Sequence, residues 1–133
     1  MALEIRWSEE VAFVQKAIDA AVPDSSGVYQ ILQDRPYPRY RGHTRILKIG
    51  KSDASLRAEI CNHFIRHTAA NRLARVKAQP GVVVSIVFTS LPPEQAGNAE
   101  SQLLREFEDT FWDVPLLNSQ RGYARGADQH YRG

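Results

Sequence analysis

The sequence has little of what several classes of protein require. It contains one cysteine, Cys61, in 133 residues, which excludes an internal disulfide and a cysteine-rich metal site. No apolar run approaches the roughly 20 residues needed to cross a bilayer. Residues 1–10 are mixed and acidic, whereas a secretory signal is basic and then apolar. We therefore expect no membrane association and a cytoplasmic setting, with Cys61 acting as a small apolar filler.

The composition is that of an ordinary globular domain. Hydrophobic residues make up 43% of the chain and charged residues 24%. A chain of 133 residues is long enough to bury one hydrophobic core and too short for two. We predict a single domain over residues 1–133, with an N-terminal helix within 1–24, a core over 25–120 and a partly flexible tail over 119–133.

The net charge of +2 is small, but the basic residues are unevenly distributed. Residues 34–77 carry eleven Lys or Arg against three acids. Residues 1–33 carry five acids against two bases, and residues 78–133 carry seven acids against four bases. A basic middle segment is typical of a protein with an anionic partner, and nucleic acid is the leading class. Solvation of two helices and a loop explains the same charges equally well.

Hydrophobic periodicity and turn residues predict the element order α-β-β-α-α-β-α. Ser8 is expected to start the first helix, which ends before the turn at 23–27. Two prolines and a glycine between residues 33 and 44 predict a loop. Asp53 or Ser55 is expected to cap the next helix. The predicted strands cover 27–32, 45–50 and 82–88, and the later helices cover 56–65, 68–77 and 93–111.

Glu100 is the most informative residue of the last predicted helix. It precedes Leu103, Leu104 and Phe107 by three, four and seven residues, so it lies on the apolar face. An ionised carboxylate on an inner face needs a partner, hydrogen bonds or a cation. A position at the edge of the apolar stripe, within reach of water, is the simpler alternative.

Other polar side chains have equally plain structural explanations. Tyr29 can present its hydroxyl beside Lys48 if their strands pair, but an aromatic residue on a strand is usually part of the core. Glu59, His63 and His67 recur one helical turn apart. They lack the order of the HExxH zinc motif, so we do not expect a zinc site.

Taken together, five short motifs resemble successive elements of the GIY-YIG nuclease superfamily. They are Gly27-Val28-Tyr29, Leu47 to Ser52, Leu56 to Phe64, Glu100, and Pro115 to Asn118. The resemblance covers about residues 25–120. It implies a GIY-YIG-like α/β fold, in which a small three-stranded antiparallel sheet is flanked by helices.

The resemblance also implies an activity, because family members cleave DNA phosphodiesters with one divalent cation, usually Mg²⁺. The expected cofactor is one Mg²⁺ or Mn²⁺ ion held by Glu100, acting as a Lewis acid. The expected partner is DNA, with RNA left open. The residues assigned to the reaction are Tyr29, Lys48, Arg57, His63, Glu100 and Asn118. Among these, Tyr29 and His63 would position or deprotonate the nucleophile, and Asn118 would organise the site.

Two positions depart from the family pattern. Lys48 stands where most members carry a second tyrosine, although some branches also have lysine. Glu59 falls at the position of the family's catalytic arginine, where a carboxylate would repel phosphate. Arg57 can replace that arginine only if its helix begins differently, and Arg66 is a further candidate. A catalytically degenerate scaffold that only binds nucleic acid, or a protein-interaction domain, is therefore the alternative.

The basic middle segment supplies the predicted nucleic-acid contacts. Its loop at 33–44 mixes cations with Tyr37 and Tyr40, a composition that suits backbone contact and base stacking. Ordinary loop solvation is the competing explanation. The residues expected to bind nucleic acid are Arg35, Arg39, Arg41, Lys51, Arg66, Arg72 and Arg75. The oligomeric state is left open.

Overall fold

The computed structural model describes residues 3–66 and 70–118 as an α/β fold with an antiparallel sheet flanked by helices. The predicted α/β class, with an antiparallel sheet flanked by helices, is confirmed, but the sheet has four strands where three were expected, and the element order begins with the additional strand. The elements are β1 (Val11–Ala12), α1 (Gln15–Ala21), β2 (Gly27–Pro38), β3 (His43–Ser52), α2 (Leu56–Cys61), the π-helix η1 (Asn62–Arg66), α3 (Ala70–Lys77), β4 (Val84–Ser90) and α4 (Pro93–Phe111).

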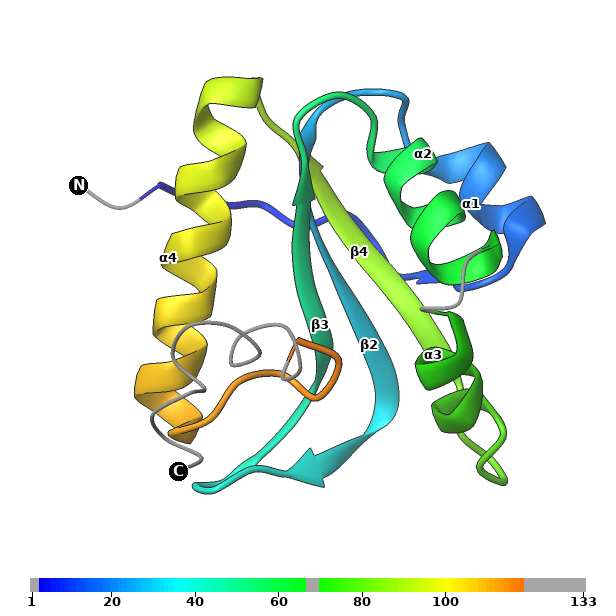
Figure 1. The fold of residues 1–133 in the computed structure, drawn as a ribbon, viewed down its shortest axis with the longest axis vertical. Helices are drawn as coiled ribbons and strands as arrows, with labels where there is room; N and C mark the ends of the chain where they lie inside the picture. Colours follow the sequence, from blue (N-terminus) through cyan, green and yellow to red (C-terminus); the bar gives the residue numbers. More distant parts are fainter. Residues whose placement is uncertain (1–2, 67–69, 119–133) are drawn as a thin grey trace.

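The sheet has the strand order β1-β4-β2-β3, and every neighbouring pair is antiparallel. The long strand β2 pairs with β3 on one side and with β4 on the other. Helix α4 covers one face of the sheet, and α1, α2 and α3 cover the opposite face (Figure 1). Strand β3 is thus an outer strand, and its free edge needs partners from elsewhere in the chain.

The predicted helix starting at Ser8 is wrong. Ser8 is extended beside β4: its N–H donates to the carbonyl of Phe88, and the N–H of Phe88 donates to its hydroxyl, both at 3.0 Å. Strand β1 continues this pairing, and the helix α1 begins only at Gln15. The unpaired edge of β4 explains the difference, because its backbone groups gain more from a strand than the local capping signal provides.

The predicted loop at 33–44 is also wrong, since most of it belongs to a long β2–β3 hairpin. Only the tip turns, where Gly42 has a φ of 78° and its carbonyl accepts from Arg39 N–H. Pro36 is tolerated because the β2–β3 register shifts between Leu32 and Tyr37, so no ladder hydrogen bond is lost there.

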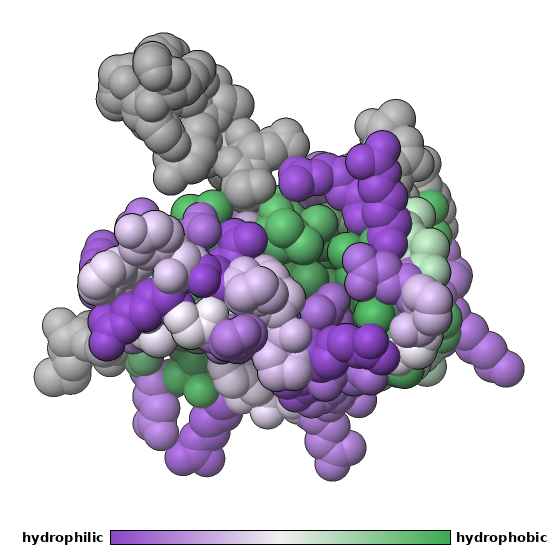
Figure 2. All heavy atoms as spheres, turned by 90° about the horizontal axis from the view of Figure 1, so that it is seen from below, coloured by the Kyte–Doolittle hydropathy of each residue, from purple (hydrophilic) through white to green (hydrophobic). Residues whose placement is uncertain are grey.

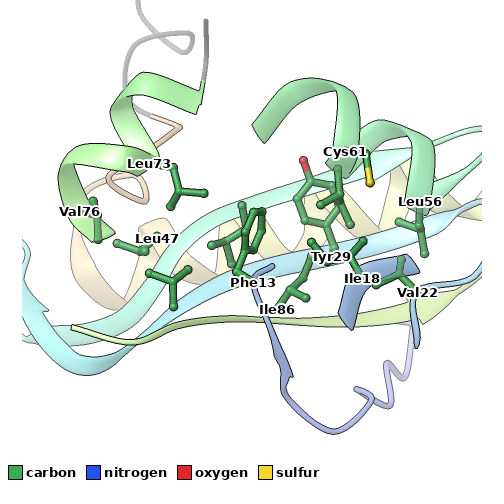
Figure 3. Packing of buried hydrophobic residues seen from close by; sticks show 13 residues of the cluster. Phe13, Ile18, Val22, Tyr29, Leu47, Leu56, Cys61, Leu73, Val76 and Ile86 are labelled. Atoms are coloured by element: carbon green, nitrogen blue, oxygen red, sulfur yellow. The ribbon is translucent and has the colours of Figure 1, made fainter. Parts of the chain in front are cut away.

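The main core lies between the sheet and the helices α1, α2 and α3 (Figure 3). Tyr29 and Leu47 reach it from the strands, Phe13 from the start of the chain, and Leu56 from α2. Cys61 packs in the same cluster, in line with its predicted role as apolar filler. None of the helices in the described part of the chain is long and apolar enough to span a bilayer.

The helix limits are partly as predicted. Helix α4 runs from Pro93 to Phe111, and Ser55 caps α2 by accepting a hydrogen bond from the N–H of Ala58. The helix predicted over 56–65 instead divides into α2 and the π-helix η1. The predicted tail at 119–133 lies outside the described residues.

Candidate active site

Tyr29 lies at the centre of the candidate site and faces Gly50 across the β2–β3 ladder. Its side chain is only 1% exposed, and its ring packs edge-on against Phe64 with centroids 6.4 Å apart. A β-carbon at position 50 would lie 2.5 Å from both Cζ and the hydroxyl oxygen of Tyr29. Only glycine leaves room for the ring, so the glycine of the second half-motif accommodates the tyrosine of the first.

The electrostatic surroundings of Tyr29 keep its hydroxyl protonated. Burial raises the pKa of Tyr29 far above its ordinary value, and the carboxylates of Glu59 and Glu100 raise it further. Glu59 lies in α2 and Glu100 in α4. Carboxylates from helices on opposite faces of the sheet therefore both act on the Tyr29 hydroxyl. At neutral pH the phenol can donate a hydrogen bond, and it does not act as a tyrosinate.

Lys51 belongs to the same electrostatic neighbourhood. The Asp53 carboxylate, 2.8 Å from the Lys51 ammonium, raises the pKa of Lys51 most strongly. The charges of Glu100 and Glu59 add smaller increases. Lys51 therefore keeps its positive charge at neutral pH, under the influence of the same two carboxylates that act on Tyr29.

Glu59 is paired with His63. Oxygen Oε2 of Glu59 lies 3.3 Å from Nε2 of His63, one helical turn away. His63 belongs to the π-helix η1, a rare geometry that is frequent at functional sites. Phe64, the next residue, contacts the rings of both Tyr29 and His63. The Glu59–His63 pair therefore lies next to the residues that surround the Tyr29 ring. Glu59, which the resemblance aligns with the family's arginine, thus contacts an imidazole.

Arg57 is directed away from this group. Because Ser55 caps α2, the helix begins at Leu56, and the start that would turn Arg57 into the arginine position is not adopted. The Arg57 guanidinium donates instead to the carbonyl of Val22 at the end of α1, with an Nε–O distance of 3.0 Å. Its predicted contact with phosphate therefore receives no support from this geometry.

Asn118 lies in the segment after α4 and binds β3 within the second half-motif, Leu47 to Ser52. Its amide oxygen accepts from the N–H of Ile49 at 2.9 Å, and its amide nitrogen donates to the carbonyl of the same residue at 3.0 Å. The N–H of Leu117 donates to the carbonyl of Leu47 at 2.7 Å. The segment after α4 thus satisfies the free edge of β3, and Asn118 clamps the residue between Lys48 and Gly50. The role predicted for Asn118 in organising the site stays a prediction.

Five of the predicted nucleic-acid contacts, all arginines, lie in two places. In the hairpin, Arg39 donates to the carbonyl of Val114 at 2.8 Å, and Arg41 lies over the ring of Trp112. Arg35 is exposed on the outer part of β2.

The second place is a groove between α3 and the segment after α4, which is lined by Arg72, Arg75, Leu116 and Leu117. Figure 2 shows the molecule from below, where hydrophobic side chains gather between hydrophilic ones. The predicted contact Arg66 has a side chain outside the described part of the structure. Lys51, described above, lies apart from both groups of arginines.

Sequence reasoning did not identify Trp112, whose ring contacts the guanidinium of Arg41. Its ring is 57% exposed and lies directly after α4, yet nothing in the spacing of residues distinguishes it from an ordinary helix end. The π-helical turn that carries His63 was missed as well, because a π-turn has no sequence signature of its own.

The resemblance implies one protein ligand for a metal ion, Glu100. Among residues 3–66 and 70–118, no three His, Cys, Asp or Glu side chains are gathered in a way that could hold a metal ion. Mg²⁺ is commonly bound by one or two carboxylates, with water and substrate phosphate oxygens completing its shell. Such a site needs only one protein carboxylate, and the half-buried Glu100 is the one that the resemblance implies.

No protein-family model, curated protein or solved structure matches this chain significantly. The resemblance to the GIY-YIG superfamily therefore rests on its sequence motifs.

Proposed function

We propose that this protein binds DNA on a GIY-YIG-like scaffold and hydrolyses phosphodiester bonds with one Mg²⁺ or Mn²⁺ ion held by Glu100. The observation that carries the proposal is the close fit of Tyr29 against Gly50, together with the charge of Glu100, which acts on both Tyr29 and Lys51. These residues come from β2, β3 and α4. The carboxylates of Glu59 and Glu100 both act on one buried hydroxyl, and a titratable group perturbed by burial and by specific charges is typical of functional sites.

Each side chain has a role that follows from its surroundings. A divalent cation at Glu100 would polarise the scissile phosphate. Lys51 keeps its charge and attracts the phosphate. Tyr29 stays protonated, so its hydroxyl orients the oxygen atom of the nucleophile by donating a hydrogen bond. His63, whose Nε2 lies 3.3 Å from Oε2 of Glu59, would act as the base that accepts a proton from the attacking water.

A second function, binding without turnover, is favoured by one specific observation. The position that corresponds to the family's arginine holds Glu59, and the neighbouring Arg57 is engaged with the carbonyl of Val22. Charge that develops on the phosphate during hydrolysis would then lack a guanidinium, a loss that slows cleavage more than binding. The exposed arginines would still retain DNA through its backbone, with an affinity that falls steeply as salt is added.

A plasmid-nicking assay separates the two functions. Wild-type protein is incubated with supercoiled DNA and Mg²⁺ or Mn²⁺, beside an EDTA control, Glu100→Ala and the matched variant Glu108→Ala. Glu108 is an exposed acid on the same helix, so its loss makes the same change in net charge. Nicking that is abolished by EDTA and by Glu100→Ala, and kept by Glu108→Ala, is the expected result.

A gel-shift titration over a range of salt concentrations completes the test. Salt-sensitive retention of DNA without nicking would replace the proposed activity with the binding function. Failure to retain any nucleic acid at low salt would contradict both functions and favour a protein-interaction domain.

A further inference from the structure

Two large aromatic rings are stacked on the surface at the tip of the β2–β3 hairpin. The rings of Tyr40 and Trp112 have centroids 5.8 Å apart and an interplanar angle of 25°. Tyr40 is 77% exposed and Trp112 is 57% exposed. One ring comes from the hairpin turn and the other from the residue that follows α4, so the pair joins two segments that are distant in sequence. Burial of apolar area does not explain rings that stay this exposed.

The backbone at Trp112 is unfavourable for the residue it carries. Trp112 has φ 57° and ψ 34°, and it is the only non-glycine residue with positive φ among residues 3–66 and 70–118. Helices commonly end with glycine or asparagine in this left-handed conformation, because a bulky side chain is strained there. A strained backbone beneath an exposed ring points to a role in binding more than to a role in stability.

The contacts around the pair hold it in place before any ligand arrives. The backbone N–H of Arg41 donates to the carbonyl of Phe111 at 3.0 Å, and its guanidinium lies 5.2 Å from the centre of the Trp112 ring. Arg39 reaches the carbonyl of Val114 at 2.8 Å and the carboxylate of Asp113 at 3.4 Å. The hairpin tip is therefore fixed to the end of α4, and a ligand need not pay for ordering the rings.

We infer that the Tyr40–Trp112 pair is a stacking platform for an unpaired nucleobase. Trp112 supports Tyr40, which remains 77% exposed and so has ring surface to offer a base. Bases within a duplex are already covered on both faces by their neighbours, whereas an unpaired base has a face to offer an aromatic side chain. Arg41 adds a guanidinium beside the rings, where it can meet the phosphate that accompanies the base.

This role rests on the proposed nucleic-acid binding and extends it to a substrate class. The preferred substrate would be a duplex that carries a single-stranded end or a displaced strand, and continuous duplex would bind less tightly. The stacked base would lie at the hairpin tip, on residues separate from Tyr29 and Glu100.

The test compares two labelled duplexes by fluorescence anisotropy, in EDTA to prevent cleavage. Both have the same short single-stranded end, but in one of them the end consists of abasic nucleotides, which keep the phosphates and lack the bases. Wild-type protein should bind the end that carries bases about 5- to 150-fold more tightly, the range for stacking one base. Tyr40→Ala should bind both duplexes equally, and Tyr40→Phe should keep the preference.

Trp112→Asn is the second diagnostic variant, because asparagine accepts the left-handed backbone but removes the supporting ring. It should also lose the preference, whereas Val83→Ala, which shortens an exposed apolar side chain elsewhere, should keep it.

Equal wild-type affinity for the two duplexes would overturn the platform and leave the proposed DNA binding intact. A preference that survives Tyr40→Ala and Trp112→Asn would also overturn it. Failure of wild-type protein to bind either duplex at low salt would remove the platform together with the proposed function.

Discussion

Replacing Gly50 by alanine tests whether the two half-motifs fit together as described. The added methyl carbon would lie 2.5 Å from Cζ and from the hydroxyl oxygen of Tyr29. Non-bonded carbon atoms prefer a separation of about 3.5–4.0 Å, so the ring or the strand must move by roughly 1 Å. The ring has little room to do so, because it is 1% exposed and packed against Phe64.

The expected loss of stability follows from two opposing effects. Overpacking of a buried site costs about 1–3 kcal/mol. Alanine restricts the unfolded chain, which returns about 0.4–1 kcal/mol. Gly50→Ala should therefore lower the free energy of unfolding by about 1–2 kcal/mol. Urea unfolding followed by circular dichroism measures this change as a lower midpoint at an unchanged slope.

Gly97→Ala is the matched control, because a β-carbon at Gly97 in α4 meets no atom within 4 Å. Removing a glycine from a helix interior should stabilise the protein by about 0.5–1 kcal/mol. Combining Gly50→Ala with Tyr29→Phe should recover part of the loss, since the hydroxyl is one of the three Tyr29 atoms in conflict. Equal stability of Gly50→Ala and wild type would refute the packing described for Tyr29.

Three further predictions concern stability and pH. Asn118→Ala leaves two buried backbone groups unpaired and should cost about 1–3 kcal/mol in urea unfolding; an unchanged midpoint would show that the clamp is not needed. The raised pKa of Tyr29 means that the folded protein keeps a proton which the unfolded chain loses above about pH 10. Stability should be full below that pH and fall above it, and Tyr29→Phe should make the fall shallower; identical alkaline profiles would contradict this. Hydrogen bonds from Arg45 and Ser85 lower the pKa of Glu10 below 4.5, so their contribution is present at neutral pH and is lost in acid. Glu10→Gln should cost less than about 1 kcal/mol at neutral pH, because the pair is half-exposed, and nothing in acid; a difference that persists in acid would assign another role to Glu10.

The sequence predicts those parts of the fold that depend on local signals. Helix α4 begins at Pro93, as the proline pair at 92–93 indicates, and the β-branched run before it forms β4. The predictions failed where distant segments decide the structure. Ser8 carries a good capping signal but lies beside the edge of β4, and the residues between 33 and 44 become strands because the hairpin packs against the segment after α4.

The candidate site divides in the same way. The sequence predicts that the two half-motifs lie on paired strands, but it places Tyr29 beside Lys48, whereas the ladder pairs Tyr29 with Gly50 and Lys48 with Ile31. A small shift in register changes which residues face each other, and the pattern of apolar residues does not fix it here. The direction of Arg57 depends on the packing of α2 against α1, which no spacing of residues encodes. The exposed Trp112 depends on how one helix end meets the hairpin tip. The direction of Arg57 and the exposure of Trp112 therefore follow from the folded structure and not from local sequence.

The most direct test of the proposed activity is the dependence of the nicking rate on Mn²⁺ concentration for wild type, Glu100→Asp and Glu100→Ala. If Glu100 holds the cation, the wild-type rate should saturate with Mn²⁺. Glu100→Asp should need more Mn²⁺ for half its maximal rate, because its shorter side chain withdraws the carboxylate from the ion. Glu100→Ala should remain inactive throughout. A Glu100→Ala protein that nicks DNA with the wild-type dependence on Mn²⁺ would contradict the account.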